Sequence, residues 1–151
     1  MHAAPSALEK LDRMQKHFVH ELGIAEEEAF LQYNLAPICL RRDVGVLGFL
    51  HKRVLGECHP GIARLFPMCG EIRPWHNKQI ESRLYECVSR PVLFNRSIFG
   101  MVHIYNRLPQ FFVDLENVSK FQHELTNVAR EACATGVAAW KDCIRISGLR
   151  T

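Results

Sequence analysis

Apolar residues recur every three or four positions along most of this chain, which is the spacing that places side chains on one face of a helix. Residues that favour helix ends separate these stretches: Gly23 and Gly56 suit C-caps, and Asn117 suits an N-cap. The pattern predicts helices over residues 6–22, 36–55, 97–107, 117–134 and 138–146, with a short helix beginning near Ala25.

The apolar face of each predicted helix is expected to lie in the core. In the first helix this face consists of Leu8, Leu11, Met14, Phe18 and Leu22. In the last helix it consists of Trp140, Cys143 and Ile144. Over the whole chain we expect a buried core that contains Leu11, Phe18, Leu47, Val54, Tyr105, Leu108, Phe121 and Leu125.

Residues 57–95 interrupt the helical pattern with four prolines, at positions 60, 67, 74 and 91. Proline and glycine favour turns and short elements over long helices. Residues 61–67 are expected to form one or two helical turns, residues 80–90 a helix or an extended segment, and residues 91–94 a short strand. We therefore predict one all-α domain of five or six helices over residues 1–151, in which any hinge or sub-boundary falls within this irregular middle.

The composition is that of an ordinary globular protein. The chain has 151 residues, of which 48% are hydrophobic and 23% are charged, so it is long enough to bury a core. It has no apolar run of membrane-spanning length and no signal-peptide pattern at its N-terminus. We therefore expect an intracellular protein, nuclear or cytoplasmic, whose six cysteines stay reduced.

The residues that catalysis needs are missing from the pattern. The aspartates at positions 12, 43, 114 and 142 stand singly, whereas two-metal phosphoryl transfer needs clustered carboxylates. The sequence contains neither a Walker-type phosphate loop nor a G-x-S-x-G elbow. Nothing in the sequence orients Cys39 and His51 as a nucleophile and base. We predict that the chain is not an enzyme and that it takes no cofactor.

Metal binding is also not favoured. The middle segment holds Cys58, His59, Cys69, His76 and Cys87. Structural zinc sites usually take ligands in pairs two to four residues apart, and this spacing is wider. The pattern therefore favours small buried thiols and surface histidines over a zinc site. His17 and His20 are interpreted as part of a solvated polar face, because two histidines do not complete a metal site.

Basic residues mark one candidate binding surface. It consists of Arg13, Lys16, Arg41, Arg42, Lys52 and Arg53. If the first and third helices pack side by side, these cations form one patch that attracts phosphate backbones. Alternatively they form solvated faces balanced by nearby carboxylates. The net charge of +3 is modest, and residues 1–75 carry nine cations and nine anions. The charge alone therefore does not decide between a phosphate-binding patch and solvated faces.

Gly45 and Gly48 lie among these cations, although glycine weakens a helix. Small residues permit another backbone to approach closely, so we favour a close crossing of the first and third helices at these glycines. The alternative is that an anionic partner lies across them.

Four segments carry a further signal: "LDRMQKHFVHELG", "NLAPICLRRDVGVLGFLHKRVLG", "RSIFGMVHIYNRLPQFFVD" and "VSKFQHEL". In this order they resemble the C-terminal region of reverse transcriptases from non-LTR (LINE-like) retrotransposons, which lies downstream of the polymerase palm. The resemblance covers roughly residues 8 to 135. The matching residues are Leu11, Asp12, Arg13 and Gln15; Leu40, Arg41 and Arg42; Tyr105, Asn106, Leu108 and Pro109; Phe121 and Leu125. The family commonly has Trp where this chain has Tyr105, whose hydroxyl needs a partner.

The resemblance implies a role without catalysis. It implies a helical segment that supports the polymerase portion of a reverse transcriptase and helps to hold template RNA or target DNA. The chain is then expected to be a detached segment whose polymerase lay upstream of Met1. The alternative hypothesis is a small helical module that binds protein through exposed apolar surface and has no nucleic-acid role.

Overall fold

The computed structural model describes residues 5–70, 79–81, 94 and 97–144. This part of the chain contains seven α-helices and one short 3-10 helix, and no strand. In chain order they are α1 (Pro5–Glu21), α2 (Glu26–Tyr33), α3 (Ile38–Val54), α4 (Pro60–Leu65), α6 (Ile98–Tyr105), α7 (Gln110–Val113), α8 (Val118–Ala134) and η2 (Trp140–Asp142). The all-α prediction is confirmed, with seven α-helices in the described part of the chain in place of the five or six expected, because α4 and α7 both form while the last predicted helix begins as the 3-10 helix η2.

The predicted helix ends are confirmed where glycine or asparagine was expected to set them. Gly23 and Gly56 have φ angles of 69° and 80°, which glycine adopts without the strain that a Cβ causes. At each, the glycine N–H bonds a carbonyl three residues back, and the next N–H bonds one five back. Both helices therefore end in the Schellman arrangement. At the start of α8 the Asn117 side chain accepts from the N–H groups of Ser119 and Lys120, at 2.8 and 3.2 Å.

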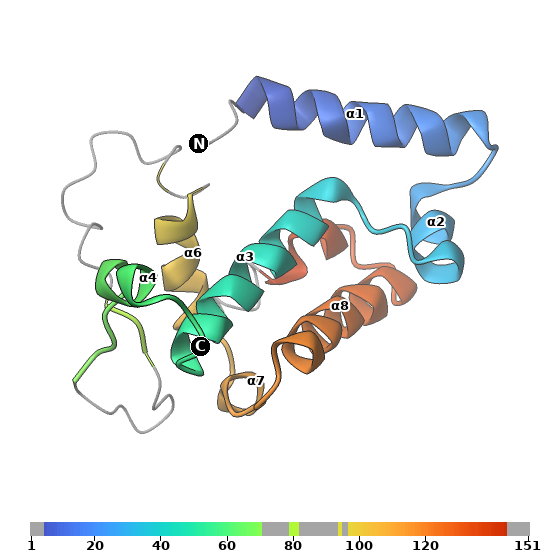
Figure 1. The fold of residues 1–151 in the computed structure, drawn as a ribbon. Helices are drawn as coiled ribbons and strands as arrows, with labels where there is room; N and C mark the ends of the chain where they lie inside the picture. Colours follow the sequence, from blue (N-terminus) through green and yellow to red (C-terminus); the bar gives the residue numbers. More distant parts are fainter. Residues whose placement is uncertain (1–4, 71–78, 82–93, 95–96, 145–151) are drawn as a thin grey trace.

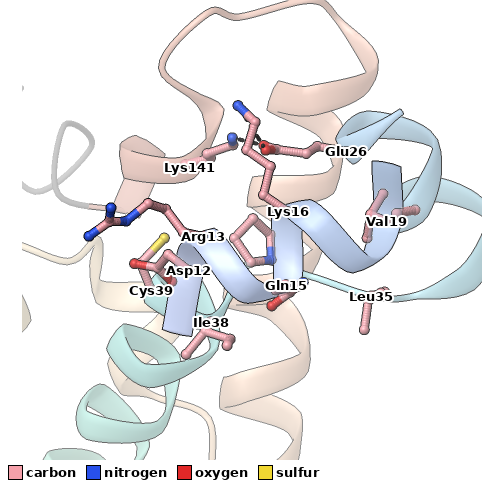
Figure 2. Close-up of a pocket in the computed structure, with 12 residues that line it drawn as sticks. Asp12, Arg13, Gln15, Lys16, Val19, Glu26, Leu35, Ile38, Cys39 and Lys141 are labelled. Carbon is pink, nitrogen blue, oxygen red and sulfur yellow. Dashed lines mark hydrogen bonds and ion pairs between the residues drawn. The ribbon is translucent and has the colours of Figure 1, made fainter. Parts of the chain in front are cut away.

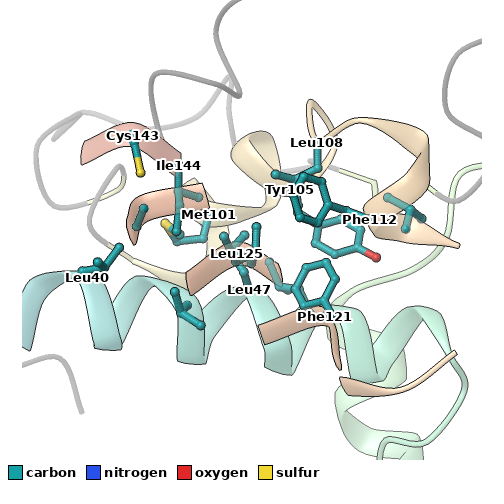
Figure 3. Close-up of a cluster of buried hydrophobic side chains, with 14 of the residues drawn as sticks. Leu40, Leu47, Met101, Tyr105, Leu108, Phe112, Phe121, Leu125, Cys143 and Ile144 are labelled. Carbon is teal, nitrogen blue, oxygen red and sulfur yellow. The ribbon is translucent and has the colours of Figure 1, made fainter. Parts of the chain in front are cut away.

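The core surrounds α3, which packs against α8 along its length and against α6 (Figure 1). Figure 3 shows how side chains from these three helices, α7 and the C-terminal turn meet in one cluster. Of the core residues expected from the sequence, five are buried and confirmed: Leu47, Tyr105, Leu108, Phe121 and Leu125. Val54 is half-buried at the edge of this cluster. The prediction is wrong for Leu11 and Phe18 of α1, which are exposed.

A buried histidine–tyrosine pair joins α3 to α6 inside this core. The His51 Nδ1 lies 2.9 Å from the Tyr105 hydroxyl, and Nε2 lies 2.7 Å from the carbonyl oxygen of Leu115. Because a carbonyl only accepts, Nε2 carries the proton and a neutral ring accepts at Nδ1 from the tyrosine. The imidazole also stacks on Phe121, with ring centroids 4.1 Å apart. His51 is therefore the partner that the Tyr105 hydroxyl was expected to need.

Asn106, the residue directly after α6, connects part of the described middle segment to the core. Residues 60–65 form α4, which confirms the expected helical turns. Met68 and Ile80 form an isolated antiparallel bridge. The Asn106 side chain pairs with both backbone groups of Ile80, donating to the carbonyl at 2.7 Å and accepting from the N–H at 3.0 Å. Residues 91–93 of the strand predicted over residues 91–94, and residues 82–90, lie outside the described residues.

Within the described residues, the helix predicted over residues 138–146 is a 3-10 helix over residues 140–142, followed by residues 143 and 144 in α-helical conformation. A 3-10 helix, η2, forms after Gly136, whose φ of 72° ends α8. Residues 145 and 146 lie outside the described part of the chain. The buried face is nevertheless confirmed, because Trp140, Cys143 and Ile144 are all buried. The Trp140 ring stacks on Phe30 of α2, with centroids 5.2 Å apart.

Candidate functional site

The most unusual surface of the described chain is the apolar face of α1, which consists of Leu11, Met14 and Phe18 and continues to Leu22 directly after the helix. These side chains are 45%, 67%, 57% and 55% exposed. The sequence predicted that this face would be buried, and that prediction is wrong. Large apolar side chains scattered singly on a surface are common, whereas several on one helix face mark an interaction site.

The reason is that α1 contacts the rest of the protein through a different side. Val19 is buried, and it points about 100° around the helix from Phe18. On this inner side Gln15 connects α1 to the start of α3. Its amide nitrogen donates to the Ala36 carbonyl at 3.0 Å, and its amide oxygen accepts from Arg41 at 3.2 Å. Polar contacts therefore orient α1, and its apolar face turns away.

An ion cluster holds the other edge of α1 (Figure 2). Glu26 of α2 lies 3.4 Å from Lys16 and also pairs with Lys141 of η2. Burial raises the pKa of the Glu26 carboxyl, but the two lysines together outweigh it, so the net shift is downward. The cluster joins three elements that are distant in the sequence, and no local pattern identifies Glu26 or Lys141 as its members.

A pocket of about 270 Å³ lies under α1, between this helix, α2, the start of α3 and Lys141. Figure 2 shows Asp12 and Cys39 together at one end of it. The Asp12 Oδ1 atom is buried, and within the described chain it has no hydrogen-bond partner. Burial, and then the nearby Asp12 carboxylate, raise the pKa of the Cys39 thiol, so Cys39 is not an activated nucleophile. The contact between α1 and the protein body is thus incompletely packed.

Two of the predicted nucleic-acid-binding residues, Arg13 and Lys16, line this pocket. Both are exposed. Arg13 donates to the Glu9 carbonyl at 3.3 Å within its own helix, and Lys16 belongs to the cluster with Glu26 and Lys141. Lys141 is a basic residue that the sequence did not place beside them.

Arg41 and Arg42 lie at the start of α3. Arg41 is exposed and is connected to α1 through Gln15. Arg42 is half-buried, with its guanidinium 3.5 Å from the carboxylate of the adjacent Asp43. The structure thus brings Arg41 close to α1, as expected for a shared surface, while Arg42 has a local carboxylate partner.

Lys52 and Arg53 lie near the other end of α3, about 18 Å along the helix axis from Arg41. Lys52 is exposed. Arg53 donates to the carbonyl oxygen of Phe66 at 2.8 Å and so attaches the segment after α4. The six cations therefore occupy both ends of α3 and the pocket side of α1. Whether they act together as a phosphate-binding surface stays a prediction.

The two glycines of α3 have different surroundings. A Cβ at Gly48 would overlap the end of the Gln122 side chain on α8, so this glycine leaves space for a side chain. The predicted crossing of α1 and α3 at the glycines is wrong, because α1 reaches the beginning of α3 through Gln15. At Gly45 a Cβ would have no atom within 4 Å, so packing does not require a glycine at this position.

Other candidate chemistry is located as follows. His17 and His20 are both exposed, and His17 lies 3.8 Å from Glu21. Among the described residues, no three His, Cys, Asp or Glu side chains are grouped to hold a metal ion. Five residues of the middle segment were considered as zinc ligands. The structure describes Cys58, His59 and Cys69, whereas His76 and Cys87 lie outside the described residues. No described helix is long and apolar enough to cross a membrane.

Of the thirteen residues that carry the resemblance, five are buried in this fold and the others are exposed or half-buried. Leu40, Tyr105, Leu108, Phe121 and Leu125 are all buried. Models of known protein families, curated proteins and solved structures all give no match to this chain. The relation to reverse transcriptases therefore stays a prediction from the sequence.

Proposed function

We propose that this chain is a non-catalytic helical segment that docks onto another protein through the apolar face of α1, and that this protein is the polymerase portion of a reverse transcriptase. The observation that carries the proposal is the exposure of three large apolar side chains on one face of α1 and of a fourth, Leu22, directly after it. Covering such a face removes apolar surface from water, which drives association. The resemblance of the sequence supplies the identity of the partner.

Weak contact with template RNA or target DNA belongs to the same proposal. Arg13, Arg41 and Lys52 are exposed, which supports it, and Lys141 adds a cation beside Lys16. Several neighbouring cations have carboxylate or carbonyl partners, so the expected affinity is low. The second candidate is a protein-binding module with no nucleic-acid role, and the exposed face of α1 favours this candidate equally.

The test is calorimetric titration of the chain with the polymerase portion of a non-LTR reverse transcriptase that lacks its own C-terminal region. We expect the parent chain to bind and the double variant Met14→Gln, Phe18→Gln to bind at least tenfold more weakly. Burying one large apolar side chain contributes about 1.5–3 kcal/mol, and about 1.4 kcal/mol is a tenfold change. The affinity for the polymerase portion should change little between about 50 and 200 mM salt, whereas the affinity for RNA should fall steeply over the same range.

The matched control is Leu65→Gln with Phe111→Gln, which removes two equally exposed apolar side chains from other elements. This control should bind the polymerase portion as the parent does. Equal loss in both double variants would show that general surface polarity, and not α1, decides binding. A parent chain that does not bind the polymerase portion would contradict the assignment of the partner.

A further inference from the structure

A groove with both polar and apolar lining crosses the face formed by α2, α3 and α8, on residues that the proposed docking through α1 does not use. It consists of two adjoining hollows of about 280 and 470 Å³. Three residues, Asn34, Gln122 and Thr126, line both hollows, so the two hollows are continuous. Arg41 and Gly45 lie in the first hollow, and Arg130 lies in the second.

The groove has the charge of an anion-binding surface. The chain has 16 Asp and Glu residues, yet none is among the described residues that line either hollow. An arginine lies in each hollow. Arg130 is held in place, because it donates to Asn34 Oδ1 at 2.6 Å and lies 5.5 Å from the centroid of the Phe30 ring. An acidic ligand would meet attraction and no repelling carboxylate along this surface.

Amide side chains give the groove its second property. Gln32, Asn34, Gln122 and Asn127 line it, and none of the described residues bonds to the side-chain amides of Gln122 or Asn127. An amide both donates and accepts, so it can pair with a peptide backbone in either direction. A phosphate backbone offers only acceptors and is usually held by many cations. Two arginines and one histidine, His123, are few for that purpose.

Both glycines of α3 shape this groove. Gly48 leaves space for the Gln122 side chain to lie against α3. Gly45 lines the first hollow, where a Cβ would contact nothing within 4 Å. Alanine would favour the helix at this position, so protein packing does not account for the glycine. Glycine is used where a ligand backbone approaches a helix closely.

We propose that this groove binds an extended, acidic peptide segment of a partner protein, whose backbone crosses Gly45 and pairs with the side-chain amides of Gln122 and Asn127. Ser119 to Arg130 span about 16 Å of helix, which matches about five residues of extended chain. Carboxylates of the peptide would lie near Arg41 and Arg130. The proposal does not depend on docking through α1, because it uses other residues.

The test is selection of nine-residue peptides from a random display library on the purified chain, followed by affinity measurement. We expect enrichment of Asp- and Glu-containing peptides. Gly45→Leu should weaken their binding at least tenfold by filling the first hollow, and Gly45→Ala should weaken it by a smaller factor, because its single Cβ lies where the peptide backbone crosses. Thermal unfolding should show that neither variant is less stable than the parent, because the space at Gly45 is empty.

A second variant, Gln122→Ala with Asn127→Ala, should lose binding by a similar factor, which keeps the proposal testable if Gly45→Leu does not fold. Lys120→Ala is the matched control on α8, because Lys120 is exposed and does not line the groove. Peptides that bind both groove variants as well as the parent would overturn the proposal. No enrichment, or stronger groove-dependent binding of a decauridylate RNA, would also overturn it.

Discussion

At the scale of single residues, the pair His51 and Tyr105 explains how the core accepts polar groups. Both side chains are fully buried, and each ring nitrogen of His51 has a hydrogen-bond partner. Satisfied in this way, a buried polar group specifies one arrangement of the helices around it. The sequence indicated that the Tyr105 hydroxyl needs a partner. It could not identify His51, because 54 residues separate the two.

We predict that Tyr105→Phe lowers the free energy of unfolding by about 1–3 kcal/mol at neutral pH, because it removes the hydrogen bond to His51. Burial raises the pKa of Tyr105 above its ordinary value. The neutral hydroxyl is therefore favoured in the folded state, and its contribution is complete below about pH 10 and decreases progressively as the pH rises above that value toward the raised pKa of the folded state. Urea denaturation at neutral pH and above pH 10 should show the difference between parent and variant shrinking. A difference that is constant with pH would contradict this assignment.

At the scale of elements, α1 and α8 show what periodicity does and does not establish. Each has 17 residues and an apolar stripe at helical spacing. The stripe of α8, with Phe121 and Leu125, is buried against α3, whereas that of α1 is exposed. Spacing identifies the side chains that share a face. It does not identify the face that meets the protein, which in α1 is decided by Gln15 and the cluster around Glu26.

The two helices give a paired prediction. Phe121→Ala should lower the free energy of unfolding by about 3–5 kcal/mol, because the ring is fully enclosed and stacks on His51. Phe18→Ala should change it by no more than about half a kcal/mol, because Phe18 is exposed. Chemical denaturation of both variants in the same buffer measures the two values. A large loss for Phe18→Ala would show that α1 buries its apolar face in solution.

At the scale of the whole molecule, the helices and caps could be predicted from the sequence, whereas the surfaces could not. Helix ends depend on neighbouring residues, so the sequence predicted the caps at Gly23, Gly56 and Asn117 from the residues around them. The groove and the ion cluster under α1 join elements far apart in the chain. Gly48 shows the difference: the sequence indicated a close crossing with the first helix, whereas in the fold the side chain of Gln122 on α8 fills this space.

Within the described chain, α1 is attached to the protein body by few buried contacts. Val19 is its only described side chain in the core, the pocket of about 270 Å³ lies beneath it, and polar contacts through Gln15 and Lys16 supply the rest. Elements with few buried apolar contacts open locally, at free energies well below that of global unfolding. We therefore expect native-state hydrogen exchange in α1 to be independent of low denaturant, while the amides of α3 and α8 exchange by global unfolding.

Raising the salt concentration should accelerate exchange in α1 alone, because the pairs of Glu26 with Lys16 and Lys141 are partly exposed and therefore screened. The amides of α8 serve as the internal control in the same spectra. Equal protection of α1 and α8 at every salt concentration would show that α1 unfolds only with the core. If α1 opens independently of the core, it can change its orientation when its apolar face meets a partner, because few contacts with the core must first be broken.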